Sequence, residues 1–180
     1  MKTRLILWTG PRHSGKTTSA ADLAQKVKSE GFQIAGLLAP SIYTNGRLTG
    51  FEAVNIATGG RVPLAERKQT KQTAEVGEFT FSEVGLKFGS NVLDPISVKS
   101  ADLIIIDEFG PWELAGNGWR KNVDSILSGT NALLVLVIRD QIIDKVKKLY
   151  ESFNFIQLNA ANEDAAAKVI EILNNLSMKK

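Results

Sequence analysis

The chain has 180 residues, 43% of them hydrophobic, which is enough to bury a sizeable core and predicts one domain over residues 1–180. It contains no cysteine and one histidine, which excludes disulfides, thiolate metal sites and cysteine nucleophiles and disfavours a histidine-rich zinc site. Lysine and arginine number 22 against 19 aspartates and glutamates, an excess too small to indicate a nucleic-acid partner.

The beginning of the chain predicts a strand, a glycine-rich turn and a helix. Residues 5–8 form an apolar run bounded by charge and by Gly10, as in a buried strand of a parallel sheet. Apolar residues recur at helical intervals across residues 16–30, and Gly31 stands where a helix C-cap belongs. A second strand is predicted at residues 34–38.

The apolar runs of the chain are all short. The N-terminal run of about five apolar residues is too short for a signal peptide. No run approaches the roughly 18–20 residues that span a bilayer. We therefore expect a cytoplasmic protein without a membrane partner.

The next segment has the composition of an antiparallel hairpin region. Asn45-Gly46 favours a type I′ turn, and Gly59-Gly60 marks a second reversal. Strands are predicted near residues 38–43, 48–55 and 61–64. The polar residues 66–75 lack periodicity and predict an exposed loop.

The second half of the chain alternates helices with strands. A spacing of four predicts one apolar helix face, made of Val84, Phe88, Val92 and Ile96. Gly85 and Gly89 weaken this helix, and Pro95 helps to end it. Further strands are predicted at residues 103–106, 132–138 and 153–158, with helices near residues 119–129, near residues 142–149 and after Asn162. The pattern predicts an α/β fold of three layers, with a mainly parallel sheet, helices on both faces and a small antiparallel hairpin excursion.

The turn after the first strand reads GPRHSGKT and satisfies the phosphate-loop pattern G-x-x-x-x-G-K-[ST], which makes the predicted fold that of a P-loop NTPase. Backbone N–H groups at a helix N-terminus bind a triphosphate, and glycines let the backbone approach it. Lys16 is expected to contact the β- and γ-phosphates, Thr17 to coordinate Mg²⁺, and Thr18 to reach the α-phosphate. The predicted nucleotide-binding residues are Gly10, Pro11, Arg12, His13, Ser14, Gly15, Lys16, Thr17 and Thr18.

Arg12 and His13 fill the variable interior of this loop. Their side chains either face solvent or contact the γ-phosphate or a protein partner whose identity the sequence does not indicate.

Two adjacent acids follow the strand at residues 103–106. A carboxylate at this strand end lies at the same sheet edge as the phosphate loop. Asp107 is therefore expected to hold Mg²⁺ together with Thr17, and Glu108 to orient or deprotonate an attacking water. Glu113 lies near the same edge, either behind the site or on the surface.

An arginine often stabilises the charge that develops during phosphoryl transfer. Arg139 directly follows the strand at residues 132–138 and is the first candidate, the alternative being an ordinary loop cation. Arg61 and Arg67, in or after the hairpin region, are weaker candidates.

At these residues the chain resembles the THEP1 family of nucleoside triphosphatases. The resemblance rests on GPRHSGKTT, GLLAP, GRLTGFEAVNIATG, RVPLA, VGEFTF and IIIDEFGPWEL. It implies a cytoplasmic, Mg²⁺-dependent hydrolase of nucleoside triphosphates with broad base preference, such as ATP and GTP. Arg12 and His13 replace the proline and glycine of the usual family loop G-x-P-G-x-G-K-T. Phe109 and Trp112 replace an isoleucine and a methionine.

Two other functions use the same phosphate loop. A small-molecule or nucleotide kinase would pass the γ-phosphate to an acceptor, but it usually needs an arginine-rich lid. A nucleotide-binding adaptor or switch, resembling the guanine-nucleotide-binding accessory proteins of molybdenum-cofactor assembly, would bind tightly and hydrolyse little. Hydrolysis by the catalytic residues Lys16, Glu108 and Arg139 is the preferred interpretation.

Overall fold

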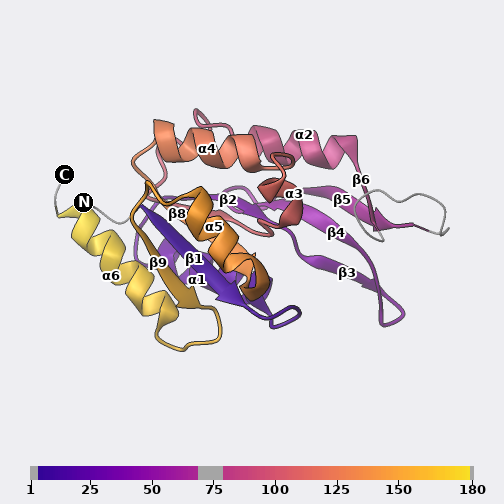
Figure 1. Cartoon of the computed structure of the whole chain (residues 1–180), viewed down its shortest axis with the longest axis horizontal. Coiled ribbons are helices and arrows are strands. Elements are labelled where there is room, and N and C mark those ends of the chain that lie inside the picture. The colour runs from indigo at the N-terminus through magenta and orange to yellow at the C-terminus, as the bar shows by residue number, and fades with distance from the viewer. Residues whose placement is uncertain (1–3, 69–78, 179–180) are drawn as a thin grey trace.

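The computed structural model describes residues 4–68 and 79–178. Within these ranges nine strands form a sheet in the order β6-β5-β4-β2-β7-β8-β1-β9, with β3 paired to β4 (Figure 1). The strands are β1 (Leu5–Gly10), β2 (Ile34–Leu38), β3 (Ser41–Thr44), β4 (Arg47–Asn55), β5 (Arg61–Arg67), β6 (Phe79–Phe81), β7 (Leu103–Ile106), β8 (Leu133–Arg139) and β9 (Phe155–Asn159). The helices are α1 (Lys16–Ser29), α2 (Glu83–Val92), α3 (Pro111–Leu114), α4 (Arg120–Gly129), the 3₁₀ turn η1 (Asp140–Ile142), α5 (Ile143–Leu149) and α6 (Ala165–Ser177).

The sheet has a parallel part and an antiparallel part. Strands β2, β7, β8, β1 and β9 pair in parallel. Strands β3, β4, β5 and β6 pair antiparallel and join the parallel part where β4 meets β2. They extend away from it as the predicted excursion (Figure 1). The predicted fold class is confirmed.

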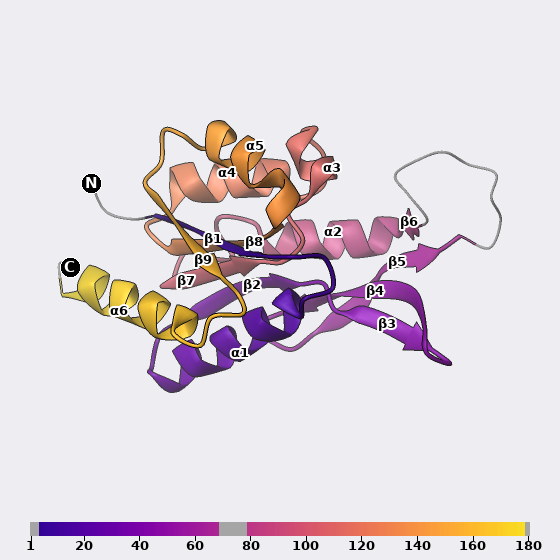
Figure 2. The same ribbon diagram turned by 60° about the horizontal axis from the view of Figure 1, so that its bottom comes forward.

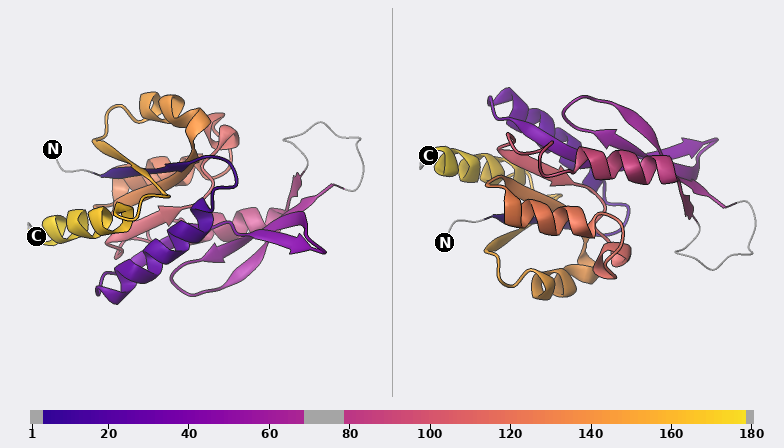
Figure 3. Two further views of the ribbon diagram at one scale, coloured as in Figure 1. Left: turned by 90° about the horizontal axis from the view of Figure 1, so that it is seen from below. Right: turned by 90° about the horizontal axis from the view of Figure 1, so that it is seen from above.

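Helices cover both faces of the parallel part. Helices α1 and α6 pack on one face and α4 and α5 on the other, while α2 lies on the same side as α4 and packs mainly against β5 and β4 of the antiparallel part (Figures 2 and 3). Successive residues of β1 point to opposite faces, so Leu5 and Leu7 belong to one core and Ile6 and Trp8 to the other. Burial on both faces explains why the strands read as continuous apolar runs.

The parallel strands bring distant segments to one edge of the sheet. Gly10 pairs in register with Arg139 across β1 and β8, and Ile106 pairs with Leu136 across β7 and β8. The phosphate loop, Asp107 and Arg139 therefore meet at the carboxyl edge, where open α/β sheets bind ligands.

The predicted apolar face of α2 is wrong at both ends. Val84 is 68% exposed and Ile96 is 84% exposed, whereas Gly85 and Gly89 are the buried residues of the helix. A Cβ on Gly85 would lie 2.4 Å from the carbonyl oxygen of Pro63. A Cβ on Gly89 would lie 2.3 Å from the ring of Trp119. The glycines weaken the helix but let it approach β5 and Trp119 closely.

The strand predicted at residues 61–64 is longer in the structure. β5 continues to Arg67, so Glu66 and Arg67 are strand residues and the loop prediction is wrong for both. Most of the predicted loop, residues 69–75, lies outside the described residues.

Candidate functional site

The phosphate loop joins the buried strand β1 to the N-terminus of α1. Gly15 is the N-cap residue with a φ of 79°, and no side chain caps the first N–H groups of the helix. These are the groups that bind anionic phosphate oxygens. A Cβ on Gly10 would lie 2.8 Å from Oγ of Ser14, so a larger residue there would have to displace that side chain. Gly15 is required by its backbone conformation, and Gly10 lets the loop side chains pack closely against β1.

His13 has a φ of 60°, a left-handed conformation that glycine adopts more readily than any other residue. Histidine is one of the few other residue types enriched in this conformation. The side chains of Arg12 and His13 are exposed, which fits the solvent-facing alternative.

Lys16 is buried at the start of α1, and its Nζ donates a hydrogen bond to the carbonyl oxygen of Pro11 at 2.6 Å. Burial lowers the pKa of Lys16, the negative charge of Glu108 raises it, and the positive charge of Arg139 lowers it further. Asp107 also raises it. Lys16 therefore lies within electrostatic reach of Glu108, Arg139 and Asp107.

Asp107 follows β7 and is 0% exposed. Its Oδ2 accepts a hydrogen bond from the N–H of Ala39 at 3.0 Å, whereas Oδ1 has no hydrogen-bond partner among the described residues. Burial raises the pKa of Asp107 to about 6, and the Ala39 N–H opposes this shift. Thr17 is close enough to lower the pKa of Asp107 further. A buried acceptor without a partner, beside a hydroxyl, is a suitable place for a cation.

Glu108 and Arg139 form an ion pair at the site. Nη2 of Arg139 lies 3.1 Å from Oε2 of Glu108, and both side chains are about one-third exposed, at 33% and 36%. Glu108 has a φ of 63°, an uncommon conformation for a residue with a side chain. The structure thus brings Arg139 to the predicted sheet edge, in contact with the predicted water-activating acid.

Glu113 is 4% exposed, so the surface alternative for this residue is wrong. Its Oε2 accepts the N–H of Gly110 at 2.8 Å, and its Oε1 accepts the N–H of Trp119 at 3.5 Å. Burial raises the pKa of Glu113 to about 7, and the N–H groups of Gly110 and Trp119 oppose this shift. The sequence offered no signal for this burial, because α3 is a four-residue helix with a glycine at its N-cap.

The two weaker arginine candidates lie on β5, which β4 and β2 separate from β7. Arg61 forms an ion pair of 3.2 Å with Glu52, and Nη1 of Arg67 donates to the carbonyl oxygen of Leu48 at 3.5 Å. Both contacts are made to the neighbouring strand β4. Neither arginine is brought to the phosphate loop by a described contact.

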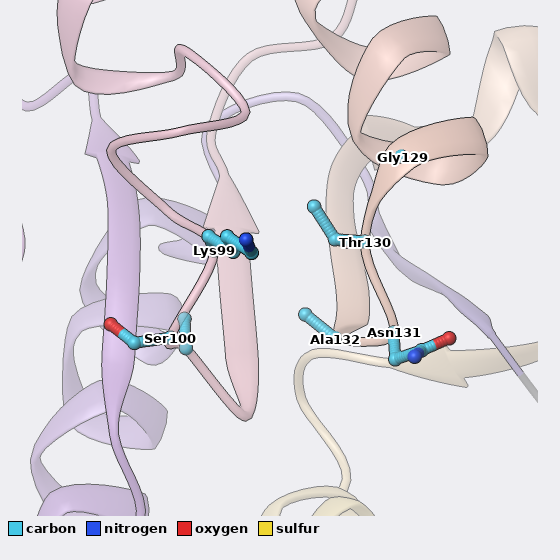
Figure 4. Close-up of a pocket in the computed structure, with 7 residues that line it drawn as sticks. Lys99, Ser100, Gly129, Thr130, Asn131 and Ala132 are labelled. Carbon is cyan, nitrogen blue, oxygen red and sulfur yellow. The ribbon is translucent and has the colours of Figure 1, made fainter.

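A cavity of about 320 Å³ lies at the opposite edge of the sheet (Figure 4). It is lined by residues 99–101 before β7 and residues 129–132 before β8. Because these segments precede their strands, the cavity is separated from Asp107 and Arg139 by the length of the strands. It is not part of the candidate site.

Among the described residues no helix is long and apolar enough to span a bilayer.

The chain is similar to known nucleoside triphosphatases. Residues 5–171 match a family model described as NTPase. A relative from Methanothermobacter thermautotrophicus, named nucleoside-triphosphatase THEP1, is 30% identical over 175 residues, covering 93% of this chain and 95% of the relative. A protein of the same name from Caldivirga maquilingensis is 27% identical over 171 residues, covering 95% and 94%.

A solved structure supports the same fold. The solution structure of a human cancer-related nucleoside triphosphatase superimposes with a TM-score of 0.68 at 20% identity, over 100% of both chains.

Proposed function

The chain belongs to the THEP1 family of nucleoside triphosphatases, hydrolases that act on nucleoside triphosphates, and on this premise we propose that it cleaves the β–γ phosphoanhydride bond with Mg²⁺. The substrates are ATP, GTP and related nucleotides, and the products are the nucleoside diphosphate and phosphate. The whole chain would act as one nucleotide-binding domain in the cytoplasm, with no nucleic-acid or membrane partner.

One observation carries this proposal: Lys16, Asp107, Glu108 and Arg139 meet at the edge where the phosphate loop begins α1. The N–H groups of the loop and of α1 would hold the triphosphate, and Lys16 would bind its β- and γ-oxygens in exchange for the Pro11 carbonyl.

The residues beside the loop fit a Mg²⁺ ion. Thr17 offers a hydroxyl, and Asp107 offers the Oδ1 atom that has no described partner. One carboxylate with a hydroxyl and substrate phosphates is a usual donor set for Mg²⁺. Bound there, the ion would neutralise charge on the β- and γ-phosphate oxygens.

Glu108 would act as the general base. Its carboxylate would take a proton from the water whose oxygen attacks the γ-phosphorus, while the bridging oxygen leaves with the diphosphate. The negative γ-phosphate would compete with Glu108 for Arg139 and so free the carboxylate to bind the water. Arg139 would then stabilise the charge on the phosphoryl group in transfer.

Phosphate release and nucleotide binding by Glu108→Gln, with and without candidate acceptors, test this function. Gln keeps the size of the side chain but cannot take the proton. We expect hydrolysis to fall by at least roughly 100-fold while binding persists. Transfer to an acceptor would indicate a kinase instead. Tight binding with no hydrolysis by the wild-type chain would indicate an adaptor.

A further inference from the structure

Glu113 lies outside the set of residues assigned above to phosphate, metal or water. It belongs to α3, which connects the acidic segment after β7 to α4. Its buried carboxylate binds two backbone N–H groups, one from Gly110 before α3 and one from Trp119 after it. The carboxylate thus joins the segment that carries Glu108 to the start of α4.

The backbone around Glu108 is fixed on both sides. The N–H of Asp107 donates to the carbonyl oxygen of Leu37 at 2.9 Å, and the N–H of Phe109 donates to that of Val137 at 3.1 Å. The ring of Phe109 is buried. The next donor along the chain is Gly110, and its acceptor is Glu113.

These bonds matter because Glu108 itself has a φ of 63°. A residue with a side chain keeps such a conformation only where its surroundings hold it there. Without the hydrogen bond from the Gly110 N–H to Glu113, the turn would lose the last hydrogen bond that fixes its backbone before α3. The Glu108 side chain could then leave its place beside Arg139.

Gly118 gives independent support for the view that the chain is shaped to hold the Glu113 carboxylate. A Cβ at this position would lie 2.1 Å from Oε1 of Glu113, so any other residue would displace the carboxylate. The backbone φ of Gly118 is 51°, which glycine adopts without strain. The chain therefore leaves room for Oε1 at Gly118 and presents an N–H donor to each oxygen.

We propose that Glu113 is a positioning residue for hydrolysis: by accepting the Gly110 N–H, its carboxyl group holds Glu108 in the turn that directs the general base to the γ-phosphate. This inference rests on the proposed function. It assigns Glu113 no contact with substrate, so its effect should appear in turnover and not in nucleotide affinity.

Three variants test the proposal by steady-state kinetics and nucleotide binding. Glu113→Ala should lower kcat roughly 10- to 100-fold with KM and Kd within about twofold, because a small displacement of a catalytic group costs rate. Glu113→Gln keeps an oxygen that accepts the Gly110 N–H and should retain kcat within about threefold. Gly118→Ala should reproduce the loss of kcat although Glu113 is intact.

The control is Thr130→Val, at the far edge of the sheet. It removes the buried hydrogen bond from Oγ1 of Thr130 to the carbonyl oxygen of Ile126. It should lower the melting temperature and leave kcat unchanged. If Glu113 only stabilised the fold, Glu113→Ala would likewise lower the melting temperature and leave kcat unchanged.

A double mutant separates positioning from general destabilisation. In a Glu108→Gln background, Glu113→Ala should reduce the residual rate no further, because the group that it positions is already gone. The proposal would be overturned if the kcat losses of the two single variants multiplied in the double mutant. It would also be overturned if Glu113→Ala left kcat unchanged, or if Glu113→Gln lowered kcat as much as Glu113→Ala. If Glu113→Ala does not fold, Glu113→Gln and Gly118→Ala decide the question.

The proposed function fails separately from this inference. It fails if the wild-type chain releases no phosphate, or if Glu108→Gln remains fully active. If Glu108→Gln is inactive and Glu113→Ala is active, only the positioning role is wrong.

Discussion

Arg139 and Glu108 contact each other across the carboxyl edge of the sheet, with Nη2 of the arginine 3.1 Å from Oε2 of the glutamate. The two residues are 31 positions apart in the chain, and they lie at the ends of neighbouring strands: Arg139 is the last residue of β8, and Glu108 comes shortly after β7. An arginine that serves a transferred phosphoryl group and an acid that serves the attacking water must both lie within reach of the γ-phosphate. Their contact is the geometric basis of the proposed mechanism.

Arg139→Ala should therefore affect catalysis far more than stability. The ion pair is partly exposed, so we expect its loss to change the free energy of unfolding by less than about 1 kcal/mol. The loss of transition-state stabilisation should lower kcat by at least roughly 100-fold. Phosphate release and urea unfolding measure the two effects on one preparation.

Arg61→Ala is a matched control for that variant. It removes a similar ion pair, Arg61 with Glu52 at 3.2 Å, from a strand away from the site. It should leave kcat unchanged. If Arg139→Ala is as active as Arg61→Ala, with kcat unchanged in both, Arg139 has no role in the mechanism.

Asp107→Asn should abolish the dependence of turnover on Mg²⁺ and leave the fold intact. The amide oxygen of Asn can still accept the N–H of Ala39, which is the described hydrogen bond of this side chain. The amide is a poorer ligand for Mg²⁺ than a carboxylate. A Mg²⁺ titration of phosphate release, with circular dichroism on the same sample, checks both parts.

Lys16→Ala provides the contrast for this titration. It should weaken nucleotide binding at every Mg²⁺ concentration, because the positive charge acts on the phosphates directly. Wild-type Mg²⁺ dependence in Asp107→Asn would show that the metal lies elsewhere.

The buried carboxyl of Glu113 predicts a pH dependence of stability. Burial raises its pKa from 4.5 to about 7, so the folded chain keeps a proton that the unfolded chain has lost. The stabilisation from this proton is fully present below about pH 4.5 and is lost as the pH rises through 7. The shift corresponds to about 3 kcal/mol.

Glu113→Gln cannot ionise and should lack this dependence. The free energy of unfolding of the wild type, minus that of Glu113→Gln, should fall by about 3 kcal/mol from pH 4.5 to pH 8. Urea unfolding across this range measures it, and Glu163→Gln, at an exposed position, is the control. Parallel curves for wild type and Glu113→Gln would mean that Glu113 is not held protonated.

His13→Gly should not destabilise the chain. The φ of 60° costs a residue with a side chain about 1–2 kcal/mol, which offsets the greater freedom of glycine in the unfolded chain. Arg12→Gly, one residue earlier and without positive φ, should destabilise by about 0.5–1 kcal/mol. Thermal unfolding compares the two. Equal destabilisation by both changes would contradict the conformation described for His13.

The sequence was most informative where function requires both a residue type and a spacing. Gly10, Gly15 and Lys16 indicate the phosphate loop. Asp107 follows a run of four large aliphatic residues, which indicates a buried strand. Parallel strands end at one edge, so these two facts were enough to predict that the segments meet.

Features that depend on tertiary packing could not be predicted in this way. Gly85 and Gly89 suggested a weak helix, and only the neighbouring Pro63 and Trp119 reveal why glycine is needed. Glu113 gave no sign of burial, since its partners are backbone N–H groups and the space that Gly118 leaves. The pairing of Arg139 with Glu108 could not be predicted without the register of β1, β7 and β8.

A crystal structure with Mg²⁺ and a non-hydrolysable nucleoside triphosphate analogue tests the central claim most directly. We expect the γ-phosphate between Lys16 and Arg139, and the ion beside Thr17 and Asp107. We expect Glu108 to be turned from Arg139 toward a water in line with the γ-phosphorus. A triphosphate bound away from the loop, or an ion that leaves Asp107 without a ligand role, would contradict it.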